Sequence, residues 1–299
     1  MVAVSLNDTD LELETRFLMK SAQSFPDISD AARWFSADYS VCSRYVVAAR
    51  EHHQTAEDAI PFLRSTCVWR DEMAVDSMIA DESLQTFETE LRQHVLLYSL
   101  CDDKLSRPLL IERVGAWDLD TIHETILESR ESVLRAHVLV SERIRRRVDD
   151  MALADAAAVA AAAAAGAGAP PDVPADRRAT LIFDAAGLPW AMLRFRSLHT
   201  LFGEMSRLDA AHFPNTIGTI FIINVSRVAS AAWAVLSHLV ATQTRLKVRI
   251  FSWSQMEAAS KELCERCGAE HVPAELGGRR QDSSPYHYRP RSSKGVTVS

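Results

Sequence analysis

In the second half of the chain, short runs of consecutive apolar residues alternate with longer segments in which apolar residues recur at helical spacing. The short runs predict strands at residues 179–183, 219–224 and 246–253. The longer segments predict helices at residues 190–211, 228–241 and 254–267. Strands that are apolar throughout are buried on both faces, and their alternation with helices favours parallel pairing. The pattern therefore predicts an α/β fold with a sheet covered by helices.

The first part of the chain shows helical spacing without comparable apolar runs. Thr55 and Asp58 have the spacing of a capping box, and they precede a helix whose apolar face includes Leu63. We therefore expect a small all-helical domain at residues 1–80, followed by a larger domain at residues 81–278.

Between these parts, a polar turn separates two short apolar runs, and a long amphipathic segment follows. The runs predict strands at residues 96–100 and 109–114. The amphipathic segment predicts a helix at residues 118–149 that ends in the basic run 143–147. Basic side chains are favourable at a helix C-terminus, so we expect this run to form a solvated helix end.

Alanine dominates residues 152–176, and this segment ends in helix breakers that include Gly166, Pro170 and Pro174. We interpret it as a surface loop inserted into the larger domain. Residues 279–299 are rich in Pro, Ser, Gly and basic side chains, which predicts a disordered basic tail.

The composition of the chain argues against several classes of protein function. The 299-residue chain has 47% hydrophobic and 24% charged residues, as globular proteins do, and a formal net charge of −7, which argues against a nucleic-acid-binding protein. It contains no glycine-rich phosphate loop and no G-x-S-x-G or H-E-x-x-H motif, so we expect no enzymatic activity. Five cysteines, an odd number, and an acidic N-terminus without the pattern of a signal peptide predict a cytoplasmic location.

Cys264, Cys267 and His271 lie close together in the sequence and are candidate metal ligands. A single C-x-x-C pair lacks the second pair of ligands that a structural zinc site needs. We therefore interpret these cysteines as structural and expect no metal.

The predicted helix at residues 228–241 carries Trp233, Leu236 and Val240 on one face and small or polar residues on the other. A helix packed against the sheet has this pattern, and a mobile lid over an apolar cavity has the same one. The pattern alone leaves both interpretations open.

Four segments carry a resemblance to a known family: DKLSRPLLIE at 103–112, FDAAG at 183–187, HFPNTIGTIFIIN at 212–224 and VPAELGG at 272–278. In this order and spacing they resemble the CRAL-TRIO lipid-binding family. The resemblance implies a mixed, mostly parallel sheet as the floor of a pocket, with covering helices and a movable gate helix, after a small helical domain. It also implies one hydrophobic lipid as ligand, no chemistry on that lipid and no other cofactor.

By position, the resemblance assigns ligand-binding residues to the floor and to the gate. The floor would include Leu110, Ile220, Ile222 and Ile250, and the gate would contribute Trp233, Leu236 and Leu239.

The headgroup positions depart from the family pattern. Asn215 stands where relatives that transfer phosphatidylinositol have a glutamate, and Arg249 aligns with a lysine of theirs, so both are headgroup candidates. Asp71 replaces a second lysine, and Pro189 and Ala191 replace a serine and a threonine that meet the phosphate of a choline lipid. We therefore expect a cargo with a small or weakly charged head and poor transfer of phosphatidylinositol.

These observations together predict a monomeric cytoplasmic protein that associates transiently with membrane surfaces and binds, transfers or presents a hydrophobic lipid. The alternative is a CRAL-TRIO scaffold in membrane trafficking or lipid signalling that keeps the fold but fills the pocket with its own side chains. A lipid that co-purifies with the protein would favour the carrier.

Overall fold

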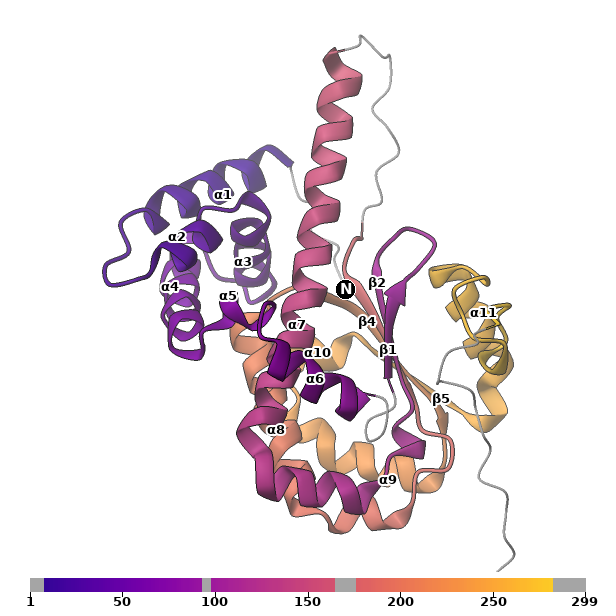
Figure 1. Cartoon of the computed structure of the whole chain (residues 1–299). Coiled ribbons are helices and arrows are strands. Elements are labelled where there is room, and N and C mark those ends of the chain that lie inside the picture. Colours follow the sequence, from indigo (N-terminus) through magenta and orange to yellow (C-terminus); the bar gives the residue numbers. More distant parts are fainter. Residues whose placement is uncertain (1–7, 93–97, 165–175, 282–299) are drawn as a thin grey trace, which may run out of the picture.

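The computed structural model describes residues 8–92, 98–164 and 176–281, and its centre is a five-stranded mixed sheet (Figure 1). The strands are β1 (Tyr98–Asp102), β2 (Pro108–Glu112), β3 (Ala179–Asp184), β4 (Ile217–Val225) and β5 (Val248–Ser252), in the spatial order β1-β2-β3-β4-β5. β1 and β2 pair antiparallel, and the other neighbours pair in parallel. The predicted α/β class with a mixed sheet is confirmed.

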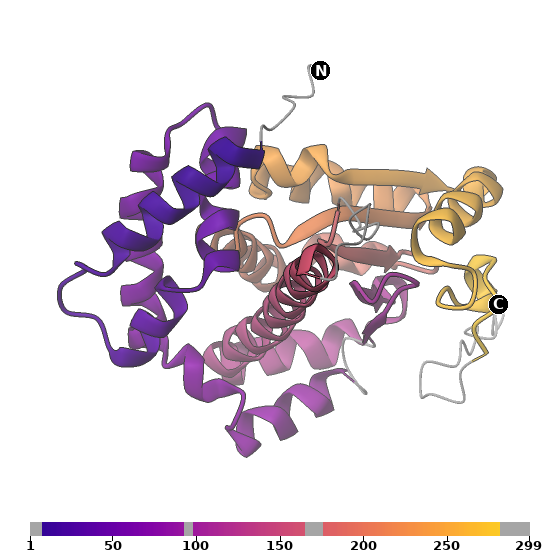
Figure 2. The ribbon, with the colours of Figure 1, turned by 90° about the horizontal axis from the view of Figure 1, so that it is seen from above.

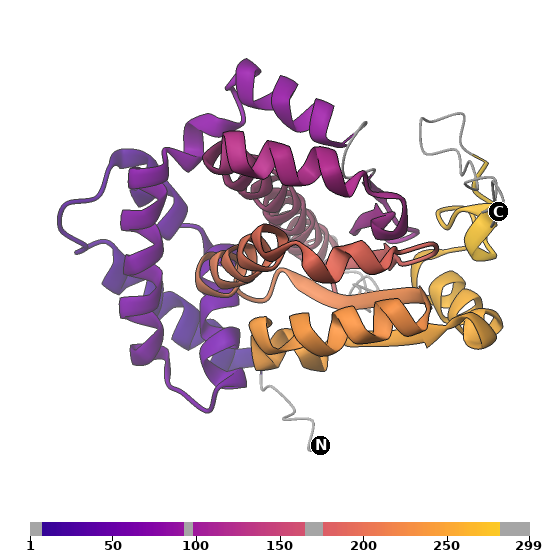
Figure 3. The same cartoon turned by 90° about the horizontal axis from the view of Figure 1, so that it is seen from below.

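Helices cover both apolar faces of the sheet. On one face, Phe221 and Ile223 of β4 pack with α11 (Met256–Cys267). The other face is turned toward α7 (Leu119–Ala164), α8 (Arg196–His212) and α9 (Arg227–Leu236), and Figure 3 shows these three helices beside one another. Two further short segments, η4 (Ser237–Leu239) and α10 (Thr242–Leu246), connect α9 to β5.

The N-terminal helices form a bundle with its own core, on one side of the sheet domain (Figure 2). They are α1 (Asp8–Ala22), α2 (Asp30–Ser36), α3 (Tyr39–Glu51) and α4 (Ala56–Met73). The predicted capping box is present at the start of α4, where the backbone N–H of Thr55 donates to Asp58 at 2.8 Å. The next two helices, α5 (Val75–Met78) and α6 (Glu82–Glu90), contribute to the core of the sheet domain, and the domain boundary at residue 80 stays a prediction.

Buried charges join the bundle to α7. The guanidinium of Arg70 on α4 donates to both carboxylate oxygens of Glu142 on α7, at 3.0 and 3.1 Å, and both side chains are buried. Glu142 also accepts from Arg145, which pairs with Asp149 one turn later, and Asp149 pairs with Arg44 of α3. These mutual pairings compensate the cost of removing the charges from water.

Two predictions about α7 are wrong. The helix continues to Ala164, so residues 152–164 are helical rather than a loop, because alanine has the highest helix propensity of all residues. The basic run 143–147 therefore lies within the helix, and its arginines pair with acids, among them Glu88 with Arg143 and Asp102 with Arg147. Residues 165–175 and the predicted basic tail from residue 282 onward lie outside the described part.

Candidate functional site

A cavity of about 870 Å³ lies between the sheet and helices α7, α8 and α9. Its walls are mainly apolar, with side chains such as Ile126, Val133, Leu181, Phe202 and Met205. This volume is in the range that takes one small molecule, and its shape follows from the fold, because parallel strands present alternate side chains to the same face. Among the helices in the described ranges, none is long and apolar enough to cross a membrane.

Five of the predicted ligand-binding residues line this cavity. Leu110, Ile220 and Ile222 come from β2 and β4, and Trp233 and Leu236 come from α9. They lie together because these strand residues face the same side of the sheet and because α9 lies across from them. The structure thus brings the two predicted walls together, and lipid contact by these side chains stays a prediction.

Three predicted residues do not line the cavity. Arg249 points to the opposite face of the sheet, where its Nη2 lies 2.8 Å from Glu262 of α11. Ile250 lies on β5, the edge strand, and is 42% exposed. Leu239 lies against Gly203 of α8 and is 37% exposed. These three positions therefore lie outside the lining of this cavity, and their contact with a ligand stays a prediction.

Two of the other headgroup positions, Asn215 and Asp71, make structural contacts. Asn215 lines the cavity, but its Oδ1 accepts a hydrogen bond from Arg178 Nη1 at 3.0 Å. Asp71 accepts the backbone N–H of Ser29 at 2.8 Å, at the start of α2. Pro189 precedes the short helix η3 (Trp190–Arg194), and the side chain of Ala191 lies outside the described set.

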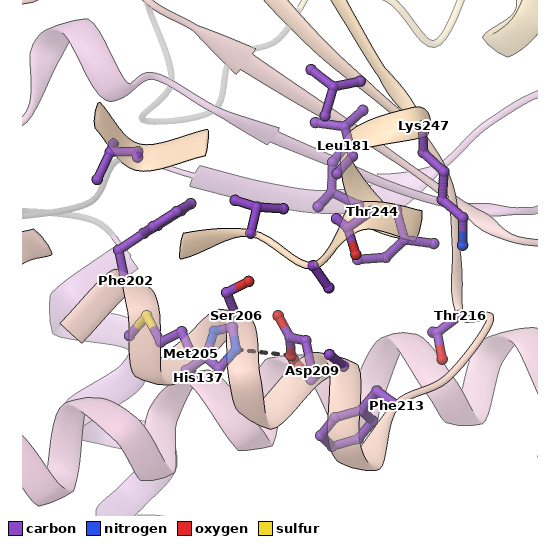
Figure 4. Close-up of a pocket in the computed structure, with 18 of the residues that line it drawn as sticks. His137, Leu181, Phe202, Met205, Ser206, Asp209, Phe213, Thr216, Thr244 and Lys247 are labelled. Carbon is purple, nitrogen blue, oxygen red and sulfur yellow. Dashed lines mark hydrogen bonds and ion pairs between the residues drawn. The ribbon is translucent and has the colours of Figure 1, made fainter. Parts of the chain in front are cut away.

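Lys247 is a cavity residue that the sequence reasoning missed. It precedes β5 and lines the cavity on the same side as Thr216 and Thr244 (Figure 4). Burial lowers the pKa of its ammonium group, and the charges of Glu51 and Asp176 oppose this shift only in part. Within the described ranges no hydrogen bond or ion pair engages the group. The signal was its place one residue before Val248, which faces the cavity.

Near Lys247, the cavity opens toward the N-terminal bundle. His52 and Gln54, both exposed, belong to its lining, and Gln243 Nε2 donates to the carbonyl of Glu51 at 3.1 Å. Lys247 thus lies near this exposed part of the lining, since the charge of Glu51 acts on it.

Titratable side chains from three elements meet at another part of the lining. His137 Nε2 of α7 donates to Asp209 Oδ1 of α8 at 2.9 Å, and Ser141 Oγ donates to the same oxygen at 3.1 Å. Glu112 of β2 lines the cavity too, and burial raises the pKa of its carboxyl to about 8. Burial acts to lower the pKa of His137, but the charges of Asp209 and Glu112 outweigh it and raise that pKa.

The candidate metal ligands do not converge. Cys267, the last residue of α11, is buried in the core, and His271 Nδ1 bonds to the carbonyl of Asp102 at 2.7 Å. In the parts of the chain that are described, no three His, Cys, Asp or Glu side chains are grouped as a metal site would require.

Comparisons with known proteins agree with this architecture. The model of the CRAL/TRIO domain family matches residues 92–278. Two Arabidopsis thaliana proteins named phosphatidylinositol/phosphatidylcholine transfer protein are similar: SFH11 is 24% identical over 180 residues, which are 59% of this chain and 41% of that protein. SFH9 is 24% identical over 242 residues, 81% of this chain and 37% of that protein.

A solved structure extends the likeness to most of the chain. The crystal structure of Sfh5 matches with a TM-score of 0.58 at 10% identity, over 93% of this chain and 90% of that chain, which shows a shared fold. The chain spans about two fifths of the length of the curated relatives above. Because the family model covers more than half of the sequence, the chain belongs to the CRAL/TRIO domain family.

Proposed function

We propose that this protein binds one phospholipid molecule in its cavity and moves it between membranes. The observation that carries this proposal is a large apolar cavity with a lysine, Lys247, in its lining. Within the described ranges no hydrogen bond or ion pair engages its ammonium group, and the carboxylates of Glu51 and Asp176 act on it through their charge alone. The acyl chains would fill the apolar part, and the phosphate would supply the counter-charge at Lys247. The names of the two Arabidopsis relatives support a phospholipid as cargo, in place of the small or weakly charged head expected from the sequence.

The energy of burial explains why such a carrier needs a gate. Removing a methylene from water is favourable by about 0.8 kcal/mol, so about 30 methylenes of two acyl chains correspond to roughly 24 kcal/mol. A lipid held in this way cannot leave through water at a useful rate. The cavity therefore has to open against a bilayer, which supplies an equally apolar environment.

We assign the gate to residues 227–239, which comprise α9 and η4. Trp233 and Leu236 close the cavity from inside, whereas Val235 is 48% exposed and Leu239 is 37% exposed. Exposed apolar side chains on such a segment can enter the interface of a bilayer while the inner ones release the lipid. The protein would then be cytoplasmic and only transiently bound to membranes.

A transfer assay between vesicles tests this proposal. Val235→Asp combined with Leu239→Asp should reduce phosphatidylcholine transfer strongly, because both side chains are exposed and a charge at the bilayer interface is unfavourable. Leu127→Asp is the matched control, since Leu127 is also exposed, at 67%, but lies on α7. Normal transfer by the double variant would contradict the gate. A purified protein that takes up no phospholipid from vesicles, as measured by native mass spectrometry, would contradict the function itself and favour a scaffold.

A further inference from the structure

β5 is the last strand of the sheet, and among the strands that the structure describes it has a neighbour on one side only, β4 (Figures 2 and 3). The backbone N–H of Ile220 on β4 donates to the carbonyl of Lys247 at 2.9 Å, and this bond fixes which residues of β5 bond to β4. Because backbone groups alternate in direction along a strand, those of Val248 and Ile250 point away from β4. In the described ranges, no hydrogen bond engages them. β5 therefore has a free edge.

Apolar side chains are exposed along this edge. Leu246, Ile250 and Trp253 are 71%, 42% and 56% exposed. Natural proteins usually protect a free edge with a proline, with lysines or with a covering helix, because its unpaired groups attract other strands. β5 contains neither proline nor lysine, and its one charged side chain, Arg249, is paired with Glu262 of α11. Such an edge can accept a strand from another molecule.

We propose that β5 pairs antiparallel with β5 of a second copy of this chain, in place of the monomer expected from the sequence. The two sheets then join into one. A dimer of this kind has twofold symmetry, so the strand has to be complementary to itself. The register of the pairing decides whether this condition is met, because it determines which side chains lie opposite each other.

Three registers of this pairing are unfavourable. With the twofold axis at residue 249, Arg249 would lie opposite Arg249 of the partner subunit, and with the axis at residue 248 it would lie opposite Lys247 of the partner subunit. Like charges directly opposite each other destabilise a strand pair. With the axis at residue 251, the innermost bonds would need the backbone N–H of Ser252, which already donates to Gln255 Oε1 at 3.0 Å.

An axis at Ile250 avoids these conflicts. The N–H and C=O of Ile250 then bond to the C=O and N–H of Ile250 of the partner subunit, and the two apolar side chains lie opposite each other. Arg249 lies opposite Phe251 of the partner subunit, whose aromatic ring attracts a guanidinium. Among the axes at residues 248–251, this one makes β5 complementary to itself both in charge and in its innermost hydrogen bonds.

The pairing places the two cavities on one side of the joined sheet. Side chains opposite each other in an antiparallel pair lie on the same face, and Val248, two residues before Ile250, lines the cavity. The α9 helices of both subunits therefore lie on this face. The dimer itself does not depend on lipid, but its consequence rests on the proposed function: if each α9 is a gate, one dimer presents two gates to the same bilayer.

The test is sedimentation velocity of the full chain at increasing concentration, without lipid, so that the result is independent of the proposed function. A strand of five residues gives a small contact, and we expect a reversible dimer: the mass should shift from 33.2 kDa toward twice this value. Ile250→Pro removes the N–H that points away from β4, which an edge strand tolerates, and should prevent the shift. Ile250→Lys should prevent it too, because it places like charges at the axis. Leu127→Lys, at an exposed position of α7, is the matched control and should dimerise normally.

A mixture of two variants tests the register itself. Ile250→Lys and Ile250→Glu should each stay monomeric alone and should form a mixed dimer together, because their charges lie directly opposite each other only with the axis at residue 250. Mixing cannot restore a variant that fails to fold, so recovery separates lost pairing from lost folding. Three results would overturn the proposal: a monomer at every concentration of the unmodified protein, an unchanged shift in Ile250→Pro and Ile250→Lys, or no mixed dimer.

Discussion

Glu112 should make the folded protein less stable as the pH rises, and Glu112→Gln should remove this dependence. The carboxyl lies at the cavity wall, where desolvation raises its pKa from an ordinary value of 4.5 to about 8. Between these values the folded protein binds a proton that the unfolded chain releases. The free energy of unfolding therefore falls as the pH increases through this range.

The size of the effect follows from the pKa difference. One pKa unit corresponds to about 1.4 kcal/mol, and pH 7 is about 2.5 units above the ordinary pKa of the carboxyl. Ionisation of the unfolded chain then favours unfolding by about 3 kcal/mol at pH 7, compared with less than about 1 kcal/mol at pH 5. Glutamine has nearly the shape of a protonated glutamate and does not ionise. From pH 5 to pH 7, the free energy of unfolding of the variant should therefore rise by about 2 to 3 kcal/mol relative to that of the unmodified protein.

The assay is urea unfolding of Glu112→Gln and of the unmodified protein at several pH values. At each pH, the difference between their free energies of unfolding is taken. Taking the difference cancels His212, which acts in the opposite direction: burial lowers its pKa to about 4, so it adds stability as the pH rises toward its ordinary value of 6.5. Glu128→Gln, at an exposed position of α7, serves as control and should give a constant difference. Parallel stability curves for Glu112→Gln and the unmodified protein from pH 5 to pH 8 would refute the reasoning.

Three further predictions concern other parts of the molecule. Arg70→Met should lower the free energy of unfolding by about 3 kcal/mol in urea unfolding, because it removes one partner of the buried pair with Glu142; an unchanged midpoint would contradict the role of this pair. Lys247→Met should reduce the extraction of phosphatidylcholine from vesicles several-fold, and unchanged extraction would show that Lys247 does not bind the headgroup. When both lipids are offered to the unmodified protein, phosphatidylinositol should be extracted less than phosphatidylcholine. Replacing residues 156–175 by a short Gly-Ser linker should change the melting temperature little, since Ala157, Ala158 and Ala161 are exposed, and a large decrease would show that this segment packs on the domain.

The fold could be predicted because its signals are local. The apolar runs placed β3 and β4 within two residues at each end, since a strand buried on both faces has no polar interruption. The capping box at Thr55 was readable for the same reason: both partners lie within one helical turn. The length of α7 was missed, because glycines and prolines near residue 170 were given more weight than the propensity of the alanines before them.

The polar part of the cavity could not be predicted from spacing. His137 and Asp209 are far apart in the sequence, and nothing in their neighbourhoods distinguishes them from surface residues until α7 and α8 pack together. Glu112 was part of a recognised segment, but its raised pKa depends on what surrounds it in the fold. Contacts between distant elements determine such properties, whereas local patterns determine only the elements.

The alternation of side chains along β5 decides which basic residue can reach the headgroup of a bound lipid. Alternate residues of a strand point to opposite faces, so Val248 and Arg249 of β5 cannot both face the cavity. Val248 lines it, and Arg249 consequently meets Glu262 of α11 on the other face. Lys247 lies before the strand begins and is not bound by this alternation, which allows its side chain to reach the same side as Thr216. Arg249→Met should therefore leave phospholipid extraction unaffected under conditions in which Lys247→Met reduces it. If Arg249→Met had the stronger effect in the vesicle assay, the phosphate would have to bind outside the cavity, and the assignment of the headgroup to Lys247 would be wrong.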